Sequence, residues 1–294
     1  MNSDVPPSGT VDPMTFDAYW SAVDAELAPI RARPVLDPVP ARTTDEATSY
    51  TVRLTSAGPY RVTGWLSIPA GDGPFPALLQ TPRYGSVNDM PHPNDRSRYV
   101  LFGLMHRGQR LADEGFAAAY PGLLTMGIDD PATYVYRGIA ADCLRAAEFL
   151  MSLAEVDPAR VAVRGDDLAL LTAARRPGFS AVQLSELLFH RAMEARLKSS
   201  HYPLEELNDH LRAGSSPETI GHTLSYFDPI RHAPAVTART LLAVDEPGWC
   251  AALADALPAA TVYQLTHLDG TDNDHLDAWL AERCGVPAMS KFVV

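Results

Sequence analysis

Short apolar segments of strand length alternate with helical segments through most of the chain, and this alternation limits the possible folds more than any other feature. The apolar segments are residues 74–82, 99–108, 156–165, 239–245 and 261–267. The segments that predict helices are residues 139–153, 167–176 and 274–285. Buried strands that alternate with helices form a mostly parallel sheet covered on both faces. We therefore predict an α/β fold.

The N-terminal part of the chain has a different character. Residues 1–45 are rich in proline and polar side chains, and only residues 16–27 have a helical pattern. We expect them to form an N-terminal arm, followed by a single domain over residues 46–294. Residues 49–57 and 60–69 alternate polar and apolar side chains around Gly58-Pro59, which predicts a β-hairpin. Residues 180–225 are expected to form a helical cover over the site.

The composition narrows the classes of partner. With 24 Lys and Arg against 36 Asp and Glu, the chain has a formal charge of −12, so nucleic acid and membrane surfaces are poor partners. The first residues lack the pattern of a secretion signal, and no apolar run approaches the ~20 residues that span a bilayer. The three cysteines are widely scattered, which fits a reducing compartment better than a disulfide framework. We expect a cytoplasmic protein that acts on a small molecule. The histidines lack ligand spacing, so neither a metal nor another cofactor is predicted.

In a parallel sheet, ligands bind beyond the carboxyl ends of the strands. The polar groups predicted at those ends are Arg83-Tyr84, Arg107-Gly108-Gln109, Gly165-Asp166-Asp167, Asp245-Glu246 and His267. The chemistry of the protein is therefore expected there.

Several stretches of the sequence carry a family resemblance. They are residues 54–69, 107–109 (Arg-Gly-Gln), 126–150, 155–165 and, more weakly, 225–236. Together they resemble the acetyl xylan esterase and cephalosporin C deacetylase family of α/β-hydrolases, over residues 50 to 285. The resemblance implies an α/β-hydrolase fold with a mostly parallel sheet, and a possible homo-oligomer.

The chain departs from this family at the nucleophile. The family has Gly-x-Ser-x-Gly on a strained turn between a strand and a helix. Here the matching residues are 165–169, Gly-Asp-Asp-Leu-Ala, so that Asp167 stands in place of the serine. Aspartate tolerates a left-handed backbone better than most residues, so the turn can survive. Asp166 is expected to cap the helix or to face solvent.

The remaining family residues carry over one by one. His267 matches the catalytic histidine, and Asp245 matches the acid, with Glu246 as the alternative. The backbone N–H groups of Leu168 and Tyr84 match the two donors of the oxyanion hole. Arg83 has no family counterpart, and it is either a solvated loop charge or a group that holds an anionic substrate.

An aspartate in place of the serine suggests a different reaction. A carboxylate is a poor nucleophile toward an acetyl ester, whereas a carboxylate hydrogen-bonded to His267 can act as a base. The sequence looks like the acetate-eliminating relatives of this family in spirotetronate polyketide (antibiotic) biosynthesis. We expect a lyase that eliminates acetic acid from an O-acetylated acyl-tetronate precursor to form an alkene, with Asp167, His267 and Asp245 as the catalytic residues.

Two alternatives remain open at this stage. One is a hydrolase, either similar to acetyl esterases or with an Asp nucleophile as in haloalkane dehalogenases and epoxide hydrolases. The other is a catalytically dead protein that serves in binding or as a scaffold.

Overall fold

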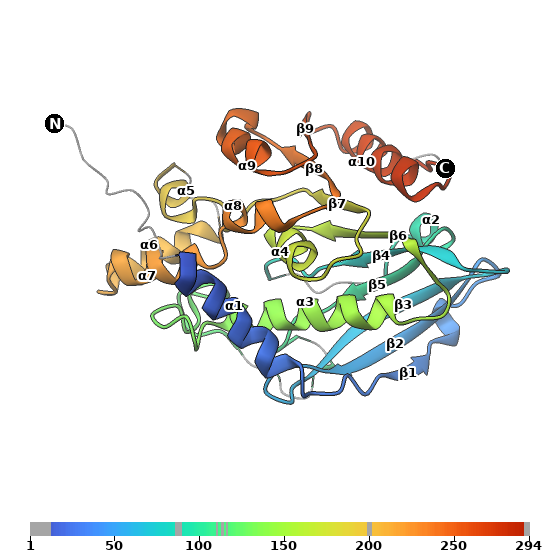
Figure 1. The fold of residues 1–294 in the computed structure, drawn as a ribbon, viewed down its shortest axis with the longest axis horizontal. Coiled ribbons are helices and arrows are strands. Elements are labelled where there is room, and N and C mark those ends of the chain that lie inside the picture. The colour runs from blue at the N-terminus through green and yellow to red at the C-terminus, as the bar shows by residue number, and fades with distance from the viewer. Residues whose placement is uncertain are drawn as a thin grey trace.

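The computed structural model describes residues 13–85, 90–109, 111–112, 115, 117–198 and 202–290 (Figure 1). Within these residues one sheet holds nine strands in the order β1-β2-β3-β5-β4-β6-β7-β8-β9. The strands are β1 (Val35–Pro38), β2 (Ala47–Thr55), β3 (Arg61–Pro69), β4 (Phe75–Gln80), β5 (Val100–Leu104), β6 (Val156–Gly165), β7 (Ala181–Leu184), β8 (Arg239–Val244) and β9 (Ala260–Gln264).

The direction of the strands divides the sheet into two parts. The pairs from β5 through β4, β6, β7 and β8 to β9 are parallel, whereas β1, β2 and β3 join one edge in antiparallel fashion. The predicted hairpin is confirmed, because Thr55 pairs with Arg61 across the Gly58 turn. The carboxyl ends of the parallel strands therefore meet at one edge, where a ligand site is expected.

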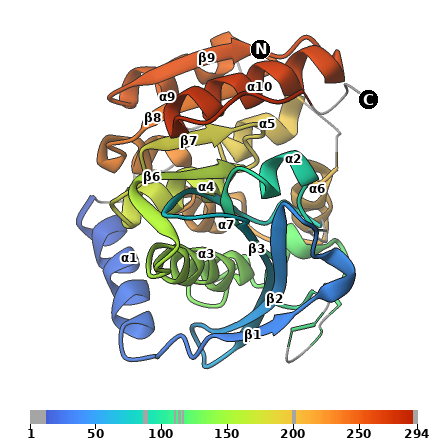
Figure 2. The ribbon, with the colours of Figure 1, turned by 90° about the vertical axis from the view of Figure 1, so that its right-hand side faces the viewer.

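Helices cover both faces of the sheet (Figure 2), which confirms the predicted fold class. The helices are α1 (Pro13–Leu27), α2 (Pro93–Arg96), α3 (Val135–Met151), α4 (Asp167–Arg175), α5 (Ala192–Lys198), α6 (Leu204–Arg212), α7 (Pro217–Ser225), α8 (Pro229–His232), α9 (Ala251–Ala256) and α10 (Asp269–Cys284). The last helix ends at Gly285 with a left-handed backbone (φ 65°), as its sequence predicts.

The buried strands send alternate side chains to opposite faces. On β4, Leu78 packs with Trp279 and Leu280 of α10, whereas Ala77 and Leu79 belong to the larger core that includes α3 and α4. This explains why the central strands are apolar without interruption, since both of their faces are covered.

The helix of the predicted arm packs on the body of the protein. Trp20 is fully buried, its indole N–H donates to the backbone oxygen of Tyr226 (3.0 Å), and the Tyr19 ring stacks on the Tyr226 ring. Residues 1–12 of the arm lie outside the described residues. The expected cover over residues 180–225 begins with a strand, since residues 181–184 form β7, and its helices are α5, α6 and α7. Among the described residues, no helix combines the length and apolar character needed to cross a bilayer.

Candidate active site

The turn from β6 to α4 differs from the strained turn that the sequence predicts. A Cβ on Gly165 would lie 2.0 Å from Thr81 Oγ1, so only glycine fits where the loop after β4 crosses the end of β6. Asp166 then has φ −96° and caps α4, its Oδ1 accepting a hydrogen bond from the Leu168 N–H (2.9 Å). Asp167 is the first residue of the helix. Neither aspartate has a positive φ, so the expected left-handed turn is not formed.

The Asp167 carboxyl is buried against the backbone of the segment after β7. Its side chain is 1% exposed, and its Oδ2 accepts hydrogen bonds from the backbone N–H groups of Leu188 (2.5 Å) and Phe189 (3.1 Å). Its Oδ1 has no hydrogen-bond partner among the described residues. Among the described residues, Asp167 and His267 thus form no direct hydrogen bond with each other. Burial, reinforced by the charge of Asp166, raises the pKa of Asp167 well above its usual range and favours the neutral acid.

Asp166 has a pKa suited to proton transfer. Burial and the nearby Glu186 raise its pKa to about 7, against the opposing effects of the Leu168 N–H and the Arg83 guanidinium. The residue is 3% exposed, so its burial is similar to that of Asp167. A carboxyl with a pKa near neutrality can both accept and return a proton. The sequence correctly predicts the cap but not the burial of Asp166.

The two predicted oxyanion donors have different surroundings. The Leu168 N–H is occupied by Asp166 Oδ1 and is not free to bind an oxyanion, which corrects the expectation for that residue. No described residue accepts a hydrogen bond from the backbone N–H of Tyr84. The Tyr84 hydroxyl donates to the buried Glu206 carboxylate of α6 and lies 2.9 Å from the Tyr202 hydroxyl. The loop that carries Tyr84 is thus attached to the helical cover.

His267 and Asp245 come together as the family pattern predicts. His267 Nε2 lies 3.4 Å from Asp245 Oδ1, and both side chains are exposed, so Asp245 rather than Glu246 is the partner. His267 has a positive φ of 60°, which is uncommon for a residue other than glycine. Its backbone N–H donates to Asp272 Oδ2 (2.9 Å), and the same carboxylate accepts from Thr266. These contacts hold the histidine loop at the start of α10.

A polar cavity of about 280 Å³ lies beside the β6 turn. Its walls include Gln80, Arg83, Arg164, Gln183 and Ser185, together with one face of α10. Arg83 donates to the Ser185 hydroxyl (3.0 Å), and its guanidinium is 3.7 Å from Glu186 Oε1.

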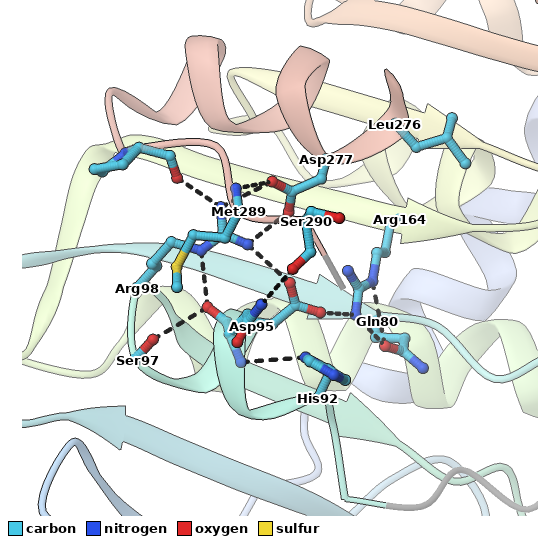
Figure 3. A network of polar contacts seen from close by, with 12 residues as sticks. Gln80, His92, Asp95, Ser97, Arg98, Arg164, Leu276, Asp277, Met289 and Ser290 are labelled. Carbon is cyan, nitrogen blue, oxygen red and sulfur yellow. Dashed lines mark hydrogen bonds and ion pairs between the residues drawn. The ribbon is translucent and has the colours of Figure 1, made fainter. Parts of the chain in front are cut away.

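A buried ion-pair network supports this cavity (Figure 3). Arg164 donates to Asp95 Oδ2 (2.8 Å) and to Gln80 Oε1. The other oxygen of Asp95, Oδ1, accepts from Arg98 (3.1 Å). Arg98 also pairs with Asp277 of α10 (2.5 Å). The network is internally neutral, because it joins two cations to two anions. It fixes the position of Arg164 in the cavity wall.

A second cavity of about 420 Å³ is mostly apolar and opens between the helical cover and the ends of β7 and β8. Its lining includes Ser185, Leu188, Leu204, Trp249 and Leu265, and Asp245 lies at its wall. This lining favours a lipophilic ligand over a strongly polar one. The volume is within the range of sites for small molecules.

The thiol at the apolar cavity is a poor nucleophile. Cys250 also lines the apolar cavity, but burial, followed by the charge of Asp167, raises the pKa of its thiol to about 11, so the thiolate is scarce at neutral pH. Within the part of the chain that the structure describes, no three His, Cys, Asp or Glu side chains form a group that could hold a metal ion.

Sequence reasoning missed Ser185 and Glu206. Ser185 directly follows β7. Because residues 180–225 are predicted to form a helical cover, the end of this strand is not among the strand ends at which polar residues are expected. Recognition of the short apolar segment 181–184 as a buried strand would have identified Ser185. No local signal marks Glu206, since its partners Tyr84 and Leu124 are distant in sequence.

Comparison with known proteins gives consistent results. The family model described as acetyl xylan esterase (AXE1) matches residues 8–248. The acetyl esterase Axe7A of Xylanibacter ruminicola is 28% identical over 249 residues, which cover 78% of this chain and 55% of that protein. The chain thus spans about half the length of this curated relative.

Solved structures show the same fold. An acetyl xylan esterase from Paenibacillus sp. R4 has a TM-score of 0.77 and 25% identity, over 89% of this chain and 91% of that one. Acetyl xylan esterase 1 from Thermoanaerobacterium sp. JW/SL YS485 also has a TM-score of 0.77, at 20% identity, over 94% and 95% of the two chains. The family match covers most of the chain, and these two structures share its fold. The chain belongs to the acetyl xylan esterase family of α/β-hydrolases.

Proposed function

We propose that this protein hydrolyses an acetyl ester of a small, lipophilic molecule, and that Asp166 carries the proton. The observation that supports this most is the Asp166 carboxyl, which is buried at the head of α4 with a pKa of about 7 and directly follows Gly165 of the polar cavity wall. Family membership favours hydrolysis over elimination.

The roles of the other groups follow from their surroundings. His267, oriented by Asp245, serves as a hydrogen-bond donor to the leaving alcohol oxygen. The Tyr84 N–H and the Arg83 guanidinium stabilise the developing oxyanion, since the Leu168 N–H is engaged. Asp167 keeps a structural role, because its Oδ2 holds the Leu188 and Phe189 N–H groups of the segment after β7.

The lining of the apolar cavity supports a lipophilic substrate over a sugar chain. Arg191 and Lys198 lie over the Trp249 ring, each 4.0 Å from its centroid, which leaves little of the ring free to stack on a sugar. The xylan named for the relatives is therefore not proposed as the substrate here.

Elimination of acetate is the second candidate, favoured by the absence of a serine from the β6 turn. A base of this pKa can remove an acidic C–H proton, as in an acetylated acyl-tetronate. In that reaction the bond between the alcohol carbon and the acetate oxygen breaks, and an alkene forms.

Reaction in H₂¹⁸O separates the two candidates. The purified protein is incubated with aryl acetates, with a long-chain alkyl acetate and with an acetylated acyl-tetronate, and the released acetate is analysed by mass spectrometry. Hydrolysis at the acyl carbon places one labelled oxygen in the acetate, and we expect this result. Unlabelled acetate together with an alkene would assign the reaction to elimination. No acetate from any of these compounds would contradict both candidates.

A further inference from the structure

Ser185 lies next to Asp166, one strand away from the β6 turn. Leu184 is opposite Gly165 in the parallel register of β6 and β7, and the Ser185 N–H donates to the Gly165 carbonyl oxygen (3.0 Å). The residues that follow this pair are Ser185 and Asp166. The two residues therefore follow neighbouring strands at the carboxyl edge of the sheet.

Ser185 also borders both cavities of the site. It is the residue shared by the linings of the apolar cavity of about 420 Å³ and the polar cavity of about 280 Å³. An ester whose carbonyl carbon lies at Ser185 can place its lipophilic part against Leu188 and Leu265 and its acetyl group toward Arg83 and Gln80. No other described lining residue has this position between the two cavities.

The electrostatic surroundings favour an ionised or attacking hydroxyl at this position. The Arg83 guanidinium donates to Ser185 Oγ (3.0 Å), so that the hydroxyl proton remains available to a base, and a cation beside the oxygen stabilises negative charge. Asp166 interacts electrostatically with the same Arg83 and with Glu186, the residue after Ser185. Arg83 thus links the two groups, by a hydrogen bond to Ser185 and by its charge to Asp166.

We propose that Ser185 is the nucleophile of this protein, in place of the serine absent from the β6 turn; the proposal rests on the hydrolysis proposed above. The Ser185 hydroxyl gives its proton to the Asp166 carboxylate as Oγ attacks the acetyl carbon. The C–O bond to the alcohol breaks, and the departing oxygen takes the proton from Asp166, which leaves acetyl-Ser185. Water then gives a proton to Asp166 and attacks the acetyl carbon, acetate leaves, and Ser185 Oγ regains the proton.

Covalent labelling tests this proposal directly. The full chain is treated with a fluorophosphonate, which modifies activated serine hydroxyls, and the adduct is located by peptide mapping. The same mapping follows an acid quench of the reaction with an aryl acetate. We expect both the phosphonyl and the acetyl group on Ser185. Asp166→Asn should slow the labelling, because it removes the base while leaving the serine in place.

Ser185→Ala should lower acetate release by at least about 10³-fold at an unchanged melting temperature. Ser180→Ala is the matched control, since Ser180 also flanks β7 but donates to the Val161 carbonyl away from the site (3.0 Å). A label on another residue, no label, or wild-type acetate release by Ser185→Ala would overturn the proposal. If Ser185→Ala releases acetate at the wild-type rate, the proposed hydrolysis stands and only the role of Ser185 is wrong. If Ser185 is labelled by the fluorophosphonate but no acetate is released, the hydrolysis of acetyl esters is contradicted and Ser185 remains the nucleophile.

Discussion

Two adjacent carboxyl groups, Asp166 and Asp167, differ in their surroundings and should respond differently to the same substitution. Asp166→Asn removes the proton acceptor but keeps a good helix cap, so acetate release should fall by about 10²-fold or more. The raised pKa of Asp167 favours its neutral acid, and an amide has the same shape and the same charge as that acid. Asp167→Asn should therefore keep acetate release within about threefold of wild type. Single-turnover kinetics of both variants on an aryl acetate measure the difference. The reverse ranking would restore Asp167 as the base that the sequence alignment indicates.

The same Asp166 carboxyl predicts a pH dependence of stability. Its pKa is about 7 in the folded protein and 3.8 in an unfolded reference, so between these values the folded state binds more protons than the unfolded state. The free energy of unfolding therefore falls as pH rises from 4 to 7, by on the order of 4 kcal/mol from this group. Asp166→Asn should flatten this decline. Melting temperatures at pH 4, 5, 6, 7 and 8 test it, and an unchanged slope in the variant would contradict the raised pKa.

At the scale of elements, the sequence predicts the sheet better than it predicts the site. The central strands and helices α3, α4 and α10 are confirmed because uniform apolar runs and helical periodicity are local signals. Strand β7 has only four residues, and its apolar run does not distinguish a strand from a buried helical turn. The Asp245–His267 pair comes from the family resemblance, which matches these two residues to the acid and the histidine. The sequence indicates Asp167 as the base, whereas we propose Asp166 for this role. The difference depends on the residue at which α4 begins, and a sequence does not define a helix start to within one residue.

The contact between α6 and the Tyr84 loop gives a prediction for the helical cover. Glu206 is 2% exposed and accepts hydrogen bonds from the Leu124 N–H (2.9 Å) and the Tyr84 hydroxyl. Glu206→Ala leaves both donors without their acceptor and should lower the free energy of unfolding by about 2 to 4 kcal/mol. Glu206→Gln keeps one acceptor and should lose about half as much. Urea unfolding measures both, with the exposed Glu218→Ala of α7 as control. Equal stability of all variants would show that the cover is not held by Glu206.

Over the whole molecule, the buried ion pairs of Figure 3 connect segments that are far apart in the chain. Arg98, next to α2, pairs with Asp277 of α10 and donates to the Pro287 carbonyl oxygen (2.8 Å), while Asp277 accepts from the Met289 N–H (2.7 Å). The C-terminal segment and α10 are thereby attached to the centre of the sheet. Since α10 begins directly after His267, this attachment also supports the position of the histidine loop.

Asp277→Asn should therefore destabilise the protein as a whole. The variant keeps the shape of the side chain but removes the charge opposite Arg98, and the loss of one partner from a buried pair costs about 3 to 5 kcal/mol. We expect a value near 3 kcal/mol, because Asp95 still neutralises part of the Arg98 charge. Asp274→Asn is the matched control, since Asp274 lies on the exposed side of the same helix and should change stability by less than about 0.5 kcal/mol. Urea unfolding of the two variants gives the comparison. Equal stability would mean that apolar contacts such as Leu78 with Trp279, rather than the ion pairs, hold α10 against the sheet.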